Sequence, residues 1–126
     1  KIPNFFPDLV KPKAEKIGPL IQSTFAKAYK AGVKIAFGTD SGVSAHGDNW
    51  QEFVLMSAAG MTNKDALRSA TIETAKLLGV EDKLGQIKKG MLADIIALQN
   101  NPLEDISIMK NVGFVMKDGI IFKQTL

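Results

Sequence analysis

One carboxylate of this 126-residue chain stands where chemistry is expected, shortly after an apolar segment. Residues 33–37 (Val-Lys-Ile-Ala-Phe) predict a buried strand that ends at Gly38, and Asp40 follows two residues later. Residues at the C-terminal end of such a strand face the active-site mouth of an α/β barrel. A carboxylate there can bind a divalent metal and accept a proton from water. The alternative is that Asp40 only caps its own loop by accepting hydrogen bonds from nearby backbone amides.

The sole histidine, His46, lies in the same loop, residues 38–49, which is rich in Gly and Asp. A single loop histidine can bind a ligand, but it is more often a surface or structural residue. The sequence has no Cys, no Ser-His-Asp set, no glycine-rich phosphate loop and no pair of zinc-binding histidines. By itself, the sequence therefore supplies no complete catalytic constellation.

The elements around this loop indicate an α/β fold. Apolar residues at spacings of three and four predict a helix over residues 14–31, with Pro19 delaying its regular start and Gly32 ending it. A helix, one glycine and a buried strand form an αβ unit of a barrel or doubly wound sheet. Further helices are predicted over residues 50–59, after a Thr62 cap, and over residues 71–78.

Beyond Glu81 the pattern changes from helices to strands and turns. Residues 93–98 predict a strand, and residues 112–123 predict a β-hairpin that turns at Asp118-Gly119. The change places a candidate domain boundary near Glu81, between a region of residues 1–80 and a region of residues 81–126.

Composition excludes several classes of function. Hydrophobic residues make up 45% of the chain and charged residues 23%, as in ordinary globular proteins. The net charge of +3 comes from basic residues scattered among acidic ones, so no nucleic-acid groove is expected. No apolar run is long enough for a membrane span. We expect a soluble protein, cytoplasmic or periplasmic, and the missing initiator Met favours a piece of a longer chain.

An ordered set of motifs covers nearly the whole chain and resembles the C-terminal end of the amidohydrolase superfamily. The similarity is closest to the branch of imidazolonepropionase-like hydrolases and metal-dependent Xaa-Pro and Xaa-Arg dipeptidases. Gly-Thr-Asp alone is a weak signal, whereas the ordered set is specific. The motifs are residues 33–42 (Val-Lys-Ile-Ala-Phe-Gly-Thr-Asp-Ser-Gly), 46–49 (His-Gly-Asp-Asn), 52–53 (Glu-Phe), 59–62 (Ala-Gly-Met-Thr), 66–71 (Ala-Leu-Arg-Ser-Ala-Thr), 75–79 (Ala-Lys-Leu-Leu-Gly), 85–96 (Gly-Gln-Ile-Lys-Lys-Gly-Met-Leu-Ala-Asp-Ile-Ile) and the stretch from 101–103 (Asn-Pro-Leu) to 117–119 (Lys-Asp-Gly).

The resemblance implies a fold and a site. Residues 1–80 would hold the last strand, residues 33–37, and the helices of a (β/α)₈ TIM-like barrel. Residues 81–126 would form part of a small β-sandwich built from both chain ends, in which Asp94 is structural. In the family the aspartate after strand eight is a metal ligand and proton shuttle, a role that carries over to Asp40. His46 corresponds to a loop histidine near the substrate in related dipeptidases.

The resemblance also implies what is missing. The family's His-x-His pair, carboxylated lysine and two further histidines lie on earlier strands, and none is present here. One or two zinc ions would therefore need ligands from the N-terminal remainder of the same enzyme. The expected activity is metal-dependent hydrolysis of peptide-type amide C–N bonds in a small amide or dipeptide, in a homo-oligomer.

Three other functions remain open at this point. The chain could be a non-catalytic binding module that shares the fold's end, or a nucleotide- or cofactor-binding α/β domain that uses residues 38–47. It could also belong to a cyclic amide or amidine hydrolase of the same superfamily, since the loops that select substrate lie mostly on other strands.

Overall fold

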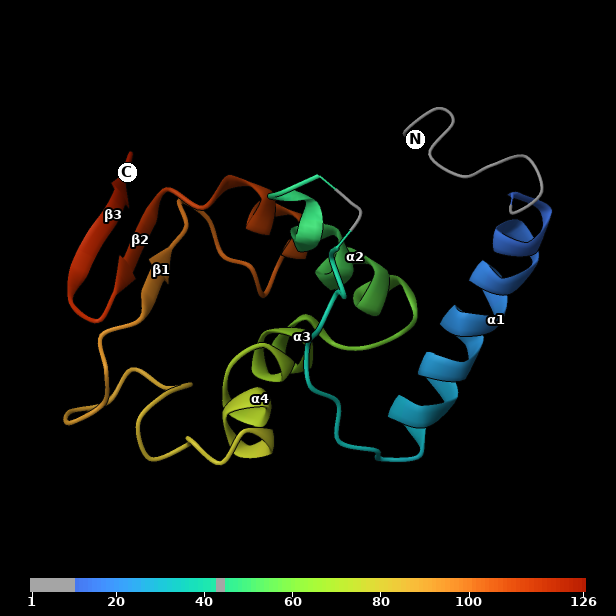
Figure 1. The fold of residues 1–126 in the computed structure, drawn as a ribbon, viewed down its shortest axis with the longest axis horizontal. Coiled ribbons are helices and arrows are strands. Elements are labelled where there is room, and N and C mark those ends of the chain that lie inside the picture. Colours follow the sequence, from blue (N-terminus) through green and yellow to red (C-terminus); the bar gives the residue numbers. More distant parts are fainter. Residues whose placement is uncertain (1–10, 43–44) are drawn as a thin grey trace.

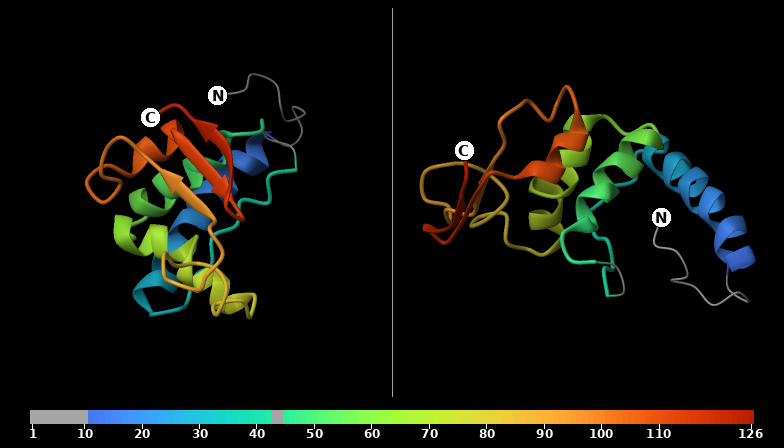
Figure 2. Two further views of the ribbon diagram at one scale, coloured as in Figure 1. Left: turned by 90° about the vertical axis from the view of Figure 1, so that its left-hand side faces the viewer. Right: turned by 90° about the horizontal axis from the view of Figure 1, so that it is seen from above.

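The computed structural model describes residues 11–42 and 45–126. Helices come first along the chain and strands last (Figure 1). The sheet and the first helix lie at opposite ends of an elongated molecule, with the shorter helices between them (Figures 1 and 2). The elements are α1 (Lys11–Lys30), the 3₁₀ helix η1 (Asp48–Trp50), α2 (Gln51–Ala58), α3 (Asn63–Ser69), α4 (Ile72–Leu77), β1 (Ile95–Ala97), the 3₁₀ helix η2 (Ile106–Asn111), β2 (Phe114–Lys117) and β3 (Ile120–Gln124).

The helices form where the sequence predicts them, with shifted ends. Pro19 lies inside α1 and does not mark its start, because the helix already begins at Lys11. Thr62 caps α3 as expected: its Oγ1 accepts a hydrogen bond from the Asp65 amide at 3.1 Å and donates one to Asp65 Oδ2 at 2.8 Å. The first of these bonds satisfies a backbone amide that the first turn of a helix leaves free.

One small core holds the middle of the molecule together. Its buried residues come from α2, α3, η2 and the turn before α3, and α2 packs against η2. Ile106 of η2, which lies beyond position 81, is thus packed against the helices that precede this position. The division into residues 1–80 and 81–126 stays a prediction. The buried cluster consists of Phe53, Met56, Met61, Ala66 and Ile106.

The strands form a three-stranded antiparallel sheet in the order β1-β2-β3. Ile95 pairs with Met116, and Lys117 pairs with Ile120 across the hairpin. The predicted turn is confirmed, since Asp118 (φ 49°) and Gly119 (φ 77°) both adopt the positive φ that tight two-residue hairpins require. All five residues of β3 are exposed.

The predicted strand over residues 33–37 is wrong for this chain as it stands. These residues run without regular secondary structure, and Val33 is more than half exposed. The reason is that a strand exists only when a neighbour completes its backbone hydrogen bonds, and the described sheet contains β1, β2 and β3 alone. Helices and a sheet together still make this an α/β chain, and the barrel and sandwich remain predictions.

The chain exposes more surface than a self-contained domain of its size. A folded protein of 13.6 kDa exposes about 6,600 Å² on average, whereas this chain exposes 9349 Å². Large apolar side chains share this exposure, on α1, α4 and β3. Within residues 11–42 and 45–126, no helix is both long enough and apolar enough to cross a membrane.

Candidate functional site

Asp40 occupies an exposed turn directly beyond the apolar segment of residues 33–37. Its φ of 48° lies in the left-handed region, which few residues other than Gly adopt and which Asp and Asn tolerate best. The Gly42 amide donates a hydrogen bond of 2.8 Å to the Asp40 backbone carbonyl. Such backbone outliers gather at functional sites. Within the described ranges the Asp40 carboxylate accepts no hydrogen bond. Residues 43–44, whose amides capping of the loop could use, lie outside these ranges, so the capping alternative stays open.

His46 lies on the same loop, in an exposed turn that precedes Gly47. Gly47 has a φ of 92° and begins η1, while the Asp48 amide donates to the Ala45 carbonyl at 3.2 Å. The structure places Asp40 and His46 at the two sides of one loop, with residues 43–44 between them outside the described ranges. The role of each remains a prediction.

The described residues fit a metal ion only in part. Asp40 offers one accessible carboxylate, a suitable ligand for a divalent ion. Among residues 11–42 and 45–126, no three His, Cys, Asp or Glu residues lie close enough together to hold a metal. The donor set of this chain is therefore one ligand, not a complete site.

Two contacts fix the segment that leads to Asp40. The Phe37 amide donates a hydrogen bond of 3.0 Å to the Ser69 carbonyl at the end of α3. The Phe37 ring stacks on Phe53 of α2, with centroids 4.4 Å apart and planes inclined by 29°. Sequence reasoning missed this stack, because the two residues are separated by an irregular loop and no local pattern pairs them.

Ser69 is a firm anchor for this segment, because only 1% of it is exposed. Its hydroxyl donates to the Ala66 carbonyl at 2.7 Å, and Thr74 of α4 donates its own hydroxyl to the Ser69 carbonyl. The Ser69 carbonyl thus accepts from both Phe37 and Thr74. The segment before Asp40 is thereby tied to the junction of α3 and α4.

Carboxyl groups with shifted pKa values are markers of function in many proteins, but here they stabilise local structure. Hydrogen bonds from Tyr29 (2.6 Å) and Thr62 lower the pKa of Asp65. The Arg68 guanidinium, 2.8 Å away, lowers the pKa of Glu73. The Asp118 amide and Lys117 lower that of Asp94. Asp94 is therefore structural, as predicted.

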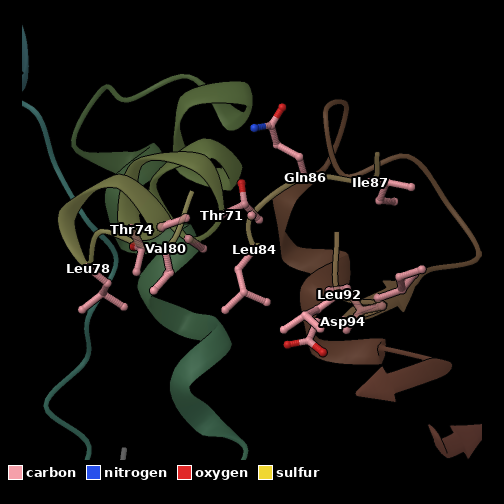
Figure 3. A pocket seen from close by; sticks show the side chains of 14 residues that line it. Thr71, Thr74, Leu78, Val80, Leu84, Gln86, Ile87, Leu92 and Asp94 are labelled. Carbon is pink, nitrogen blue, oxygen red and sulfur yellow. The ribbon is translucent and has the colours of Figure 1, made fainter. Parts of the chain in front are cut away.

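A cleft of about 370 Å³ separates α4 from the chain around β1. Thr71, Thr74, Leu78 and Val80 line one side of it, and Leu92 and Asp94 line the other (Figure 3). Its two threonine hydroxyls already donate to backbone carbonyls of α3, and Asp94 is held by the hairpin. Neither Asp40 nor His46 is among its lining residues. The cleft is apolar and does not coincide with the candidate site.

Comparison with known proteins confirms the resemblance that the motifs suggested. The sequence model described as "Amidohydrolase family" matches residues 12–121. A structure described as a Xaa-Pro dipeptidase with bound methionine in the active site is 59% identical, with a TM-score of 0.88 over 97% of this chain and 30% of its own. Ochratoxinase from Aspergillus niger is 38% identical over 91% of this chain, which spans only 25% of that relative. A 5-methylthioadenosine/S-adenosylhomocysteine deaminase from Teredinibacter turnerae is 36% identical over 58% of this chain and 19% of its own length.

Proposed function

This chain belongs to the amidohydrolase family, and from that premise we propose that it forms part of a metal-dependent hydrolase that cleaves peptide-type amide bonds. The observation that carries the proposal is the exposed, left-handed Asp40 at the end of an anchored apolar segment. The 59% identity with a Xaa-Pro dipeptidase supports a dipeptide as the substrate. Members of this superfamily generally bind metal ions, and we propose zinc here.

Asp40 is the general base of the proposed reaction. Its carboxylate, free of competing hydrogen bonds in the described part of the chain, is available to accept the proton of the attacking water. The same carboxylic acid then returns that proton to the leaving nitrogen, so that the amide breaks into an acid and an amine. Asp40 would be one ligand of a bound zinc ion, whose chemistry would be to activate the attacking water.

The remaining metal ligands come from residues outside this chain. A catalytic zinc has three protein ligands as a rule, and the described residues provide no group of three. The exposed apolar surface of α1, α4 and β3 supports the same view, because other parts of the enzyme would cover it. We also propose that the assembled enzyme is a homo-oligomer, as expected from the family resemblance.

His46 contributes to substrate handling in this proposal. It is exposed and shares the loop of Asp40, and Gly47 (φ 92°) turns the chain just after it. A side chain in that place can reach a substrate bound beside Asp40 while leaving the metal to other ligands.

A second function in the same family deserves a direct comparison. The similarity to a 5-methylthioadenosine/S-adenosylhomocysteine deaminase favours hydrolysis of a cyclic amidine, in which ammonia leaves. Both reactions use the same proton path through Asp40, since each attacks a carbon bonded to nitrogen with water. They differ in the group that departs.

The test of the proposed function is a substrate panel with the full-length enzyme that contains this chain. Xaa-Pro dipeptides, cyclic amides and adenosine-type amidines are offered in parallel, with and without a chelator, and amino acid or ammonia release is measured. We expect proline to be released from the Xaa-Pro dipeptides, and we expect the chelator to abolish this release. Ammonia release from the amidines alone would establish the second function, and no hydrolysis of any of the three would contradict both.

A further inference from the structure

The segment of residues 38–52, a loop followed by η1 and the first two residues of α2, carries both candidate site residues, Asp40 and His46; we call this segment the site loop. The residues that flank it are Phe37 and Phe53, whose rings are stacked with centroids 4.4 Å apart. The loop therefore leaves and returns to the same point of the core. Closing a loop of this length fixes both of its ends at a cost in chain entropy, which the stacked rings help to offset.

The Phe53 side of this closure is firmly held. Phe53 is 7% exposed and lies in the core cluster with Met56, Met61 and Ile106. Near it, Lys110 of η2 lies over the ring of Trp50, 5.8 Å from the centroid, which ties η1 to η2. The Phe53 ring is thus a fixed surface against which Phe37 can be placed.

The Phe37 side has fewer supports, although Ile35 also packs against the core cluster. Within the described ranges, the bond from its amide to the Ser69 carbonyl is the one backbone hydrogen bond that ties residues 34–40 to a distant segment. Asp40 follows three residues later with a φ of 48°, a conformation that persists only where its surroundings hold it. The position of Phe37 therefore helps to set where the backbone of Asp40 lies.

We propose that Phe37 and Phe53 are positioning residues for Asp40, acting as an aromatic clasp at the base of the loop that carries it. The inference rests on the proposed function of Asp40 as general base. Because the clasp holds the loop that carries both Asp40 and His46, its loss should lower the turnover number and raise KM, with the larger effect on the turnover number. Displacing a catalytic group by about 1 Å is enough to lower a rate by about a hundredfold.

The experiment uses the full-length enzyme with Phe37→Leu, Phe53→Leu and the double variant. Each single variant is expected to lower kcat about tenfold or more and to raise KM by a smaller factor. The double variant should be no slower than the slower single, because either change already removes the stack. Hydrogen exchange of residues 38–52 should become faster in all three.

Two matched variants separate positioning from general loss of packing. Phe37→Tyr keeps the ring, and Phe37 is only partly buried, so wild-type kcat is expected. Met61→Leu alters the same buried cluster at a residue outside the loop and its stack, so kcat and loop exchange should stay unchanged. Equal losses of kcat in Met61→Leu and Phe37→Leu would overturn the clasp.

Asp40→Asn, measured in parallel, distinguishes failure of the inference from failure of the proposed function. If Asp40→Asn is inactive while Phe37→Leu keeps wild-type kcat, the clasp alone is wrong. If Asp40→Asn keeps wild-type kcat, the proposed role of Asp40 is wrong and the clasp falls with it.

Discussion

The Asp94 carboxylate accepts a 2.8 Å hydrogen bond from the Asp118 amide, which joins the segment before β1 to the hairpin turn 24 residues later. Its second oxygen accepts from the Lys117 Nζ at 2.9 Å. Asp94 thus satisfies a backbone amide of the turn that connects β2 and β3, with both of its oxygens engaged by the hairpin. The Asp40 carboxylate differs from it, because no hydrogen bond reaches it from the residues that the structure describes.

The first prediction concerns pH and Asp94. The Asp118 amide and Lys117 favour the charged carboxylate and lower its pKa below the ordinary value of 3.8. A group with a lowered folded pKa stabilises the fold above its unfolded pKa and loses that contribution as pH falls through the folded value. In the full-length enzyme, the urea midpoint of wild type should therefore exceed that of Asp94→Asn near neutral pH. The difference between the two midpoints should disappear as the pH falls below 3.8. A gap independent of pH would contradict this account.

The second prediction concerns Gly85 and Gly90, which share nearly the same backbone conformation (φ 89° and 91°). A Cβ at Gly85 would lie 2.8 Å from both the Thr71 carbonyl oxygen and the Ala75 Cβ, whereas a Cβ at Gly90 would meet nothing within 4 Å. Gly90→Ala should cost about 1–2 kcal/mol for the backbone conformation alone. Gly85→Ala should cost about 3 kcal/mol or more, because the clash adds to it. Equal unfolding free energies of the two variants would show that the gap beside α4 is not tight.

The third prediction is that residues 1–126 alone do not form a well-protected monomer. The apolar side chains of β3, including Ile120 and Phe122, are exposed, and an open edge strand of this kind promotes pairing with other chains. Expressed alone, the chain should aggregate or self-associate, and the rest of the enzyme, supplied separately, should restore solubility. Sedimentation measures the self-association of the chain, and hydrogen exchange measures the protection of its amides. A soluble, protected monomer would instead favour a self-sufficient binding module.

Local patterns were sufficient to predict most of this fold. The periodicity of α1, the Thr62 cap and the Asp118-Gly119 turn depend on neighbours within a few residues, and all three form. Residues 33–37 fail as a strand because a strand requires partners that no local pattern supplies. For the same reason, Asp40 could be singled out from its place in the sequence, whereas the contact that holds its segment against Phe53 could not.

The fourth prediction concerns His46. His46→Ala in the full-length enzyme should raise KM or lower kcat, because the proposed contact is with substrate. The metal content, measured by elemental analysis, should equal that of wild type. Stoichiometric loss of metal would make His46 a ligand and contradict the assignment.

The most direct measurement of the central claim is the kcat of Asp40→Asn in the full-length enzyme. Asn tolerates the left-handed conformation at φ 48° almost as well as Asp, so the substitution removes the base while the backbone stays as it is. A thermal unfolding midpoint equal to that of wild type would confirm that the fold of the variant is intact. The account predicts a loss of about 10²–10⁴ in kcat, and turnover equal to wild type would contradict it.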